Sequence, residues 1–524
     1  MPKLGFGIHA NGNPALRIAL DNGTDLRTEP SSNVGKFQFD SENTKLSHIE
    51  YMITELHITY GGSGWNGMSV WFFNPGDFHW TTPITTNSGG VMGNTCGGQI
   101  YNEGEYGNWS KHLFKEFWGF GYMPLVEYKQ LEAGTTDTFK GPLLDKTLGN
   151  YSGKIVSMNG KIANWTVGFR NLNWNDYRRE CYRIFTSSGK SYVETVWRLP
   201  IRDVPLPDYS TTPVSGQQVL LLSPTTTRLA LPGRDVNDTD PNHYIFHEDK
   251  IPAKIMAAGD VNIALGGTVT INTPLPLSIL TSMDFHVKRQ ADAEFWNPPY
   301  FIGTGEDQEL GFTYKVQAQS ILITNLAESA ITVRYVIHAS DDQAHTTGGK
   351  KVLLKGNDGV QDFIQIKRPG SSDLAPGLND IIIDTRLAYM PIIAEGWLVW
   401  PTDFPTVVAS GARYKGERMA TVSFANPDPK FKPFVKQIVV FPEDNRVPSN
   451  SDNGIHQVFV DAGSWTGRCT ARSSWANLHE TSVDFYMAGS NPYDMDGGGT
   501  NPVYPDNNPA LGMRYYIFGI PDSL

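Results

Sequence analysis

The sequence has no surplus of positive charge. It contains 43 Lys and Arg residues against 54 Asp and Glu residues, which gives a formal net charge of −11. A protein that grips nucleic acid needs Lys and Arg to displace counterions from the phosphates, and an anionic membrane surface attracts the same residues. The basic pairs Arg178–Arg179 and Lys350–Lys351 stand alone. We therefore expect neither nucleic acid nor an anionic membrane among the partners.

Long apolar runs are also missing. No window approaches the roughly 20 apolar residues of a membrane span, so we expect no membrane insertion. The opening MPKLGFGIHANG has no apolar stretch of signal-peptide length. The three cysteines, Cys96, Cys181 and Cys469, lie far apart and lack the spacing of metal ligands. We interpret them as free thiols of a protein made in a reducing cytosol.

Charged residues make up only 19% of the chain, whereas turn formers and aromatic residues are abundant. There are 52 glycines, 34 prolines, 22 tyrosines, 26 phenylalanines and 13 tryptophans. Aromatic residues favour strands, and frequent Gly and Pro favour the turns between them. This composition predicts a mainly β fold with many loops.

A pattern of two short strands, a turn and a third apolar segment occurs three times. The three openings are residues 4–20, 219–232 and 352–366, and the third segments are residues 36–40, 244–249 and 380–384. Each unit also closes on a similar strand, at residues 182–185, 335–338 and 515–518. Internal similarity of this kind predicts three divergent copies of one β-domain, in equivalent positions. The alternative is that a β-rich chain produces such likenesses by chance.

The opening and closing strands divide the chain into three units. They are an N-terminal β domain (1–206) with Gly-rich aromatic loops, a middle β domain (214–343), and a C-terminal β domain (350–524) with a long loop insertion. The Pro-rich stretch 200–213 has the composition of a linker. The expected architecture is tandem β-sandwich or jelly-roll-like domains. Residues 108–120 and 285–295 are helix candidates, and Asn159–Gly160 predicts a hairpin turn.

Catalytic chemistry has weak candidates. Glu103 with Glu105 and Asp494 with Asp496 are acidic pairs in Gly-rich segments, and a glycosidase needs two carboxyl groups about 5–9 Å apart. Acidic residues in such loops are more often solvated turn residues. The sequence contains no nucleophile elbow and no phosphate-binding loop. We expect no enzymatic activity.

Metal binding has equally incomplete motifs. Asp235, Asn237, Asp238 and Asp240 resemble part of a calcium loop but lack its central Gly and its final Glu. His243 and His247 would suit zinc only on a helix, and their surroundings predict a strand. We expect no metal ion and no cofactor.

Aromatic residues beside Gly, Asn and Ser are the best binding candidates. They are Trp65, Trp80, Tyr101, Tyr106, Trp109, Trp465 and Trp475. Rigid aromatic area beside adaptable polar groups suits recognition, and aromatic faces stack on sugar rings. The alternative is that these side chains plug the ends of the cores. We expect the loops at 61–68, 88–107 and 491–512 to lie at exposed ends of the domains.

The two ends of the chain resemble those of small tail-associated proteins of tailed bacteriophages. The resemblance rests on the start Met1-Pro2-Lys3-Leu4-Gly5-Phe6 with its hairpin, and on the end, residues 514–521 with the sequence RYYIFGIP. It implies a non-enzymatic structural protein of the tail tip or baseplate, similar to a tail fibre. Such a protein would be made in the bacterial host cytoplasm and built into the virion.

The resemblance also implies partners. They are other tail or baseplate proteins and further copies of this chain, as a trimer before a hexamer, with a host receptor or glycan as an additional contact. The alternative is a carbohydrate-binding or polysaccharide-degrading tail spike protein.

Overall fold

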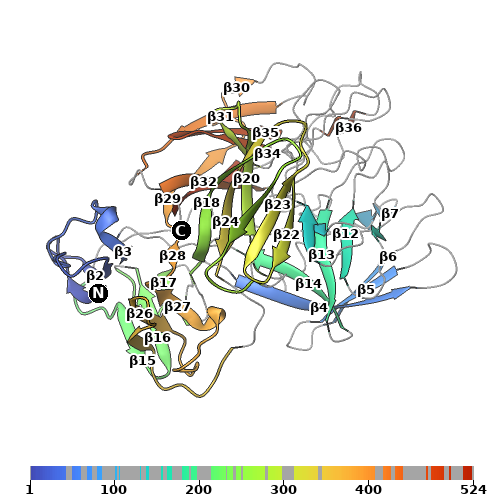
Figure 1. The fold of residues 1–524 in the computed structure, drawn as a ribbon. Coiled ribbons are helices and arrows are strands. Elements are labelled where there is room, and N and C mark those ends of the chain that lie inside the picture. The colour runs from blue at the N-terminus through green and yellow to red at the C-terminus, as the bar shows by residue number, and fades with distance from the viewer. Residues whose placement is uncertain are drawn as a thin grey trace.

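The computed structural model describes residues 2–42, 214–297, 312–339, 345–407, 417–426, 431–440, 474–488 and 512–521, with short gaps at 232, 240–242, 249–251, 278–280 and 282. Elsewhere it describes mainly the backbone of individual strands, most of them between residues 50 and 197. The described residues form strands with a few 3₁₀ turns and contain no α-helix, so the predicted mainly β fold is confirmed (Figure 1). No helix among them is long and apolar enough to cross a membrane.

The three predicted openings form three small sheets of the same construction. Each is a hairpin followed by a third antiparallel strand, in the orders β1-β2-β3, β15-β16-β17 and β25-β26-β27. Their bounds are β1 (Lys3–Ile8), β2 (Pro14–Ala19) and β3 (Phe37–Asp40); β15 (Leu220–Ser223), β16 (Thr226–Ala230) and β17 (Tyr244–Phe246); β25 (Leu353–Asn357), β26 (Asp362–Lys367) and β27 (Ile381–Asp384).

The register of the three sheets agrees residue by residue. The middle strand has a bulge at the same place in each copy, after Ile18, Leu229 and Ile366. A side chain just beyond the third strand accepts a hydrogen bond from a backbone N–H of the middle strand in every copy. These bonds are Leu16 N to Ser41 Oγ (2.9 Å), Thr227 N to Glu248 Oε2 (3.1 Å) and Ile364 N to Thr385 Oγ1 (3.0 Å). Shared bulges and shared anchors indicate one repeated structural unit.

The three small sheets pool their apolar faces in one core. Ile18, Leu229 and Ile366 occupy the same position in their sheets and are all buried in this cluster. Leu4, Leu220 and Leu353, one on each first strand, pack against it. Because every sheet presents the same face to the cluster, the sheets surround it, and we call this assembly the three-sheet body (Figure 1, lower left). The repeated openings therefore meet in space, although more than a hundred residues separate them along the chain.

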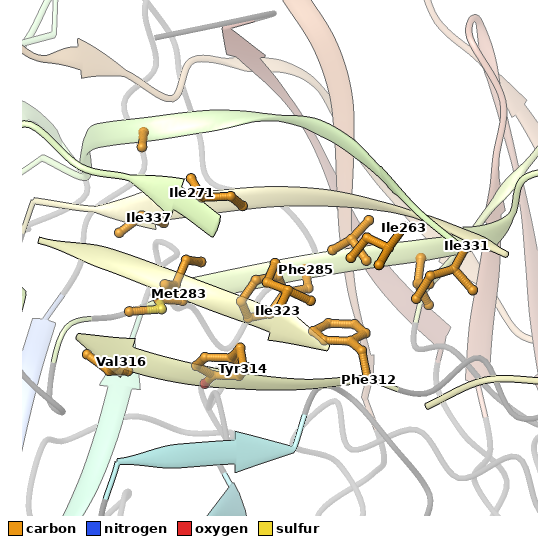
Figure 2. Packing of buried hydrophobic residues seen from close by; sticks show 14 of the residues in the cluster. Ile263, Ile271, Met283, Phe285, Phe312, Tyr314, Val316, Ile323, Ile331 and Ile337 are labelled. Carbon is orange, nitrogen blue, oxygen red and sulfur yellow. The ribbon is translucent and has the colours of Figure 1, made fainter. Parts of the chain in front are cut away.

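After its small sheet, the middle unit continues into two sheets with the orders β18-β24-β20 and β19-β23-β22. The strands are β18 (Lys254–Ile263), β19 (Thr268–Asn272), β20 (Met283–Arg289), β22 (Phe312–Gln317), β23 (Ser320–Asn325) and β24 (Ile331–His338). The two sheets bury a common cluster that includes Met283, Phe285, Phe312, Ile323 and Ile337 (Figure 2).

The third unit repeats this order with the sheets β29-β37-β32 and β31-β35-β34. The strands are β29 (Ile392–Val399), β31 (Glu417–Ser423), β32 (Phe431–Val440), β34 (Ser474–Leu478), β35 (Ser482–Ala488) and β37 (Gly512–Pro521). In the middle and third units, β18 pairs with the last strand β24 and β29 with the last strand β37, and the two have matching bulges, after Ile255 in β18 and after Ile392 in β29. The predicted closing strands 335–338 and 515–518 lie in β24 and β37, in equivalent register.

The remaining strands join or extend these sheets. β21 (Phe295–Asn297) pairs with β20 and β34, so one nine-stranded sheet runs from the middle unit into the third, with β28 (Ala388–Tyr389) at one end and β30 (Thr406–Val407) at the other. β10 (Thr138–Lys140) and β9 (Gln130–Leu131) extend the sheet beside β22. Units 2 and 3 are therefore joined by a continuous sheet as well as by the three-sheet body.

The first unit has a different order, β11-β12-β13-β14-β4-β5-β6. Its strands are β4 (Glu50–Tyr60), β5 (Met68–Phe73), β6 (His79–Ile84), β11 (Ile155–Val156), β12 (Ile162–Val167), β13 (Glu180–Ser187) and β14 (Lys190–Trp197). β11 and β12 form the hairpin predicted around Asn159–Gly160. Two short ladders complete the strands, β7 (Tyr101–Asn102) with β8 (Glu105–Tyr106), and β33 (Arg468–Cys469) with β36 (Met495–Asp496).

The helix predicted at 285–295 is wrong, because this stretch forms the end of β20 and the start of β21. Phe285 and Val287 alternate into the core, whereas Asp284 and His286 point to the third unit, where they meet Lys436 and Val435. Alternation with a period of two suits a strand between two partners. The other helix candidate, 108–120, lies outside the described residues.

A buried polar array joins the middle and third units. The Asp284 carboxylate lies 2.7 Å from Lys436 Nζ and 3.6 Å from His338 Nε2. Arg334 makes a two-pronged contact with Asp260 (2.8 and 3.0 Å) and donates to the Pro433 carbonyl (2.7 Å). Buried charges need such partners, since removal from water costs several kcal/mol per ion.

We predict that Lys436→Met destabilises the chain by about 3–5 kcal/mol, because it leaves the Asp284 carboxylate buried without its ammonium partner. The double variant Asp284→Asn/Lys436→Met should recover much of this loss. Denaturant unfolding measures both, and Lys315→Met, in the exposed pair with Asp137, is a control with an expected cost of about 0–1 kcal/mol. Equal costs for Lys436→Met and Lys315→Met would contradict the prediction.

Candidate functional site

A groove opens on the outer side of the first small sheet, between β1 and the loop that connects β2 to β3. We call residues 20–36 the β2–β3 loop. The groove has a volume of about 420 Å³ and is lined by Gly5, Phe6, Gly7, Ile8, His9, Ala15, Arg17, Leu26 and Arg27. It combines apolar walls with a polar floor, as binding sites commonly do.

Small residues on the outer face of the hairpin create the groove. A Cβ atom on Gly5 would lie 2.7 Å from Leu26 Cδ1, so a larger residue there would force the Leu26 side chain to move. A Cβ atom on Gly7 would meet nothing within 4 Å. Gly7 is exposed and pairs with the buried Ala15 on β2, so the open space lies over Gly7.

Arg17 forms the floor of the groove and is almost completely buried. Its guanidinium lies 2.5 Å from Glu42 and 3.2 Å from Asp40, and it donates to the backbone carbonyls of Leu26 and Glu29, each at 2.9 Å. Charged partners offset the cost of burying the cation. The carbonyl contacts also fasten the β2–β3 loop over the sheet, so Arg17 holds the groove in shape.

His9 lies beside Arg17 and is also buried. Its Nδ1 is 2.8 Å from Glu42 Oε2 and 3.2 Å from an Arg17 Nη atom. His9 Nε2 and Arg17 Nε are buried polar atoms that have no hydrogen-bond partner among the residues described in the structure. A buried polar atom without a partner is costly, and both residues line the groove.

Glu42 is held in its charged form. Burial by itself raises the pKa of its carboxyl, but hydrogen bonds from Asn11, Ser31 and Asn13, together with the charge of His9, outweigh burial and leave the pKa below its ordinary value. Both Glu42 and Asp40 are thus engaged in holding Arg17.

The register fixes which backbone groups of β1 face outward. Leu16 N donates to Ser41, and Leu16 O accepts from Ser41 N at 3.1 Å, so both groups of Leu16 point toward β3. Its partner on β1, Phe6, is therefore in a non-hydrogen-bonded pair, and its N–H and C=O point away from β2. The same alternation applies to Ile8. Ala10 N continues this outward row and donates to Arg27 O at 3.0 Å.

Exposed side chains mark the same edge. Phe6 is 46% exposed and Ile8 is 60% exposed, although both lie on the same face of β1 as Leu4, which packs against the shared core. An exposed strand edge with apolar residues is a template for further strand pairing. The groove and the β1 edge together form the candidate binding site.

The aromatic residues predicted from sequence lie elsewhere. Trp80 is in β6, Tyr101 and Tyr106 face each other in the β7–β8 ladder, and Trp475 is in β34. They belong to three different sheets. The predicted loop 88–107 therefore contains two short paired strands, β7 and β8. Trp65, Trp109 and Trp465 lie outside the described residues.

The acidic pairs and the predicted metal ligands either make local contacts or have side chains outside the described residues. Glu105 lies in β8 and Asp496 in β36, and their side chains, with Glu103 and Asp494, fall outside the described residues. Asp235 accepts from Asn237, and Asp238 lies 2.7 Å from His243 Nδ1, so each is engaged locally. Among the described side chains, no cluster of three His, Cys, Asp or Glu residues could hold a metal ion.

Sequence reasoning missed the groove, although two signals for it were present. Gly5 lies within a strand pattern, and a glycine at such a position indicates close approach of another segment. Arg17 interrupts the apolar run of β2, and a charge within a buried strand requires partners. Comparison with protein-family models, curated proteins and solved structures found no match to this chain.

We predict that Glu42→Gln destabilises the chain at about pH 7 and that this difference shrinks in acid. The lowered pKa of Glu42 means that its stabilisation is complete above its ordinary value of 4.5 and is lost as the pH falls through the lower folded value. Denaturant unfolding at about pH 7 and about pH 3 measures the effect, with the exposed Glu328→Gln as control. A Glu42→Gln effect that does not change with pH would contradict the account.

Proposed function

We propose that this chain is a non-enzymatic structural protein of a tailed-phage virion, located at the tail tip or baseplate, that assembles with other tail proteins. The resemblance of the two chain ends supports the location. The observation that carries the assembly role is the three-sheet body, in which three copies of one sheet share a core and each keeps a first strand at its edge.

The repeated edges favour assembly over catalysis. β1, β15 and β25 are end strands of their sheets, and such edges pair readily with another chain. A body with three equivalent edges suits partners arranged around a symmetry axis, as tail proteins are. A homo-oligomer, with a trimer before a hexamer, belongs to this proposal, and host-surface contact is an additional role.

The polar groups of the groove fit the same role. A hydrolytic site needs one carboxyl group as acid and another as base or nucleophile. Asp40 and Glu42 are instead both bound to Arg17, which fixes the β2–β3 loop. This arrangement supports a binding surface with a rigid shape.

The proposal is tested with a phage whose gene for this chain carries a stop codon. Particles grown in a host that does not suppress the stop codon should lack the tail tip in negative-stain electron microscopy. They should also fail to infect, since a structural subunit is missing. A plasmid copy of the wild-type gene should restore both, and mass spectrometry should detect the chain in restored particles.

Normal, infective particles without the chain would overturn the proposal. Reducing-sugar release from host polysaccharide by the purified chain would instead support the polysaccharide-degrading alternative. The two readouts are independent, because one follows particle structure and the other follows chemistry in solution.

A further inference from the structure

We propose that the groove beside β1 binds an extended segment of a partner protein, which adds to the first sheet as a fourth strand and places an aromatic side chain and a carboxylate on this site. The inference names the kind of partner for the assembly role. It rests on that role only in taking the partner to be another protein of the particle.

The backbone of β1 supplies the pairing groups. The N–H and C=O groups of Phe6 and Ile8 point outward by the register of the hairpin, and both residues are exposed. The Ala10 N–H in the same row already donates to a backbone carbonyl, that of Arg27, at 3.0 Å. The β1 edge therefore already has a backbone partner at Ala10. Ile8 and Phe6 offer the same outward geometry to an added strand.

The third copy of the sheet shows what fills the hollow. Gly356 on β25 is equivalent to Gly7, and its partner on β26 is Phe363, where the first copy has Ala15. The Phe363 ring covers Gly356 so closely that a Cβ atom there would lie 2.7 Å from the ring. The third copy thus carries an aromatic ring of its own over the glycine.

The first copy lacks this ring, and a Cβ atom on Gly7 would meet nothing within 4 Å. A groove of about 420 Å³ remains there. Side chains of an added strand alternate between the two faces of the sheet, so one of them would enter the hollow. An aromatic side chain from the partner would occupy the place that Phe363 fills in the third copy.

Charge defines the second feature of the partner. Arg27 lines the groove and is exposed, and its guanidinium forms no ion pair with any side chain that the structure describes. The neighbouring Asp25 accepts instead from the Arg27 backbone N–H and from Thr28 Oγ1. Arg17 on the floor is neutralised by Asp40 and Glu42. The available cation is at the mouth of the groove, where a carboxylate of the added strand would meet it.

The experiment uses the purified full-length chain and a displayed library of random peptides about ten residues long. We expect selection to enrich peptides that carry an aromatic residue close to Asp or Glu within an alternating pattern. Fluorescence polarisation then measures the affinity of one enriched peptide for the wild-type chain and for its variants.

Two variants test the geometry. Ala15→Phe builds into the first copy the ring that the third copy has, and it should weaken binding at least about tenfold by filling the hollow. Arg27→Glu reverses an exposed charge and should also weaken binding about tenfold, with no change in the melting temperature. Val360→Phe, in the exposed hairpin turn of the third copy, is the matched control and should bind as the wild type does.

Two results would overturn the inference. One is a library that yields no enriched sequence. The other is an enriched peptide that binds Arg27→Glu and folded Ala15→Phe as tightly as the wild type. Neither result depends on particle formation, so the peptide site and the virion role stand or fall separately.

Discussion

The shared core of the three-sheet body is the constraint on which the rest of the structure depends. A three-stranded sheet with strands of three to six residues has one apolar face and too little area to stabilise itself alone. Three copies solve this by burying Ile18, Leu229 and Ile366 together. The pooling draws residues 3–40, 220–246 and 353–384 to one place, from which the larger sheets of the second and third units extend.

The shared core also accounts for the position of the candidate site on the outer face of the first small sheet. Because the inner faces of the small sheets are used by the core, a binding site on these sheets is left with their outer faces and edges. The Phe363 ring covers Gly356 on the outer face of the third copy, whereas a Cβ atom on the equivalent Gly7 of the first copy would meet nothing within 4 Å. Arg17 and its acidic partners keep the β2–β3 loop in place. The difference between Phe363 and Ala15 therefore decides whether the sheet's own aromatic ring lies over the glycine at this position.

The sequence predicted the local elements better than their assembly. Alternating apolar residues and turn chemistry located the three openings and the closing strands of the second and third units, because both signals are local. The meeting of the openings was not predictable, since nothing local records a contact across more than a hundred residues. Phe285 to Phe295 was mistaken for a helix because both faces of β20 are buried. The groove depends on the pairing of Gly7 with Ala15, which only the register reveals.

Hydrogen exchange detected by mass spectrometry tests the shared core most directly. Peptides that cover β2, β16 and β26 should exchange with one common free energy of opening. Ile366→Ala should lower that free energy in all three by the same amount, about 2–5 kcal/mol, whereas the exposed Val360→Ala should leave it unchanged. A loss of protection confined to β26 would show that the three sheets are stabilised separately and would contradict the account.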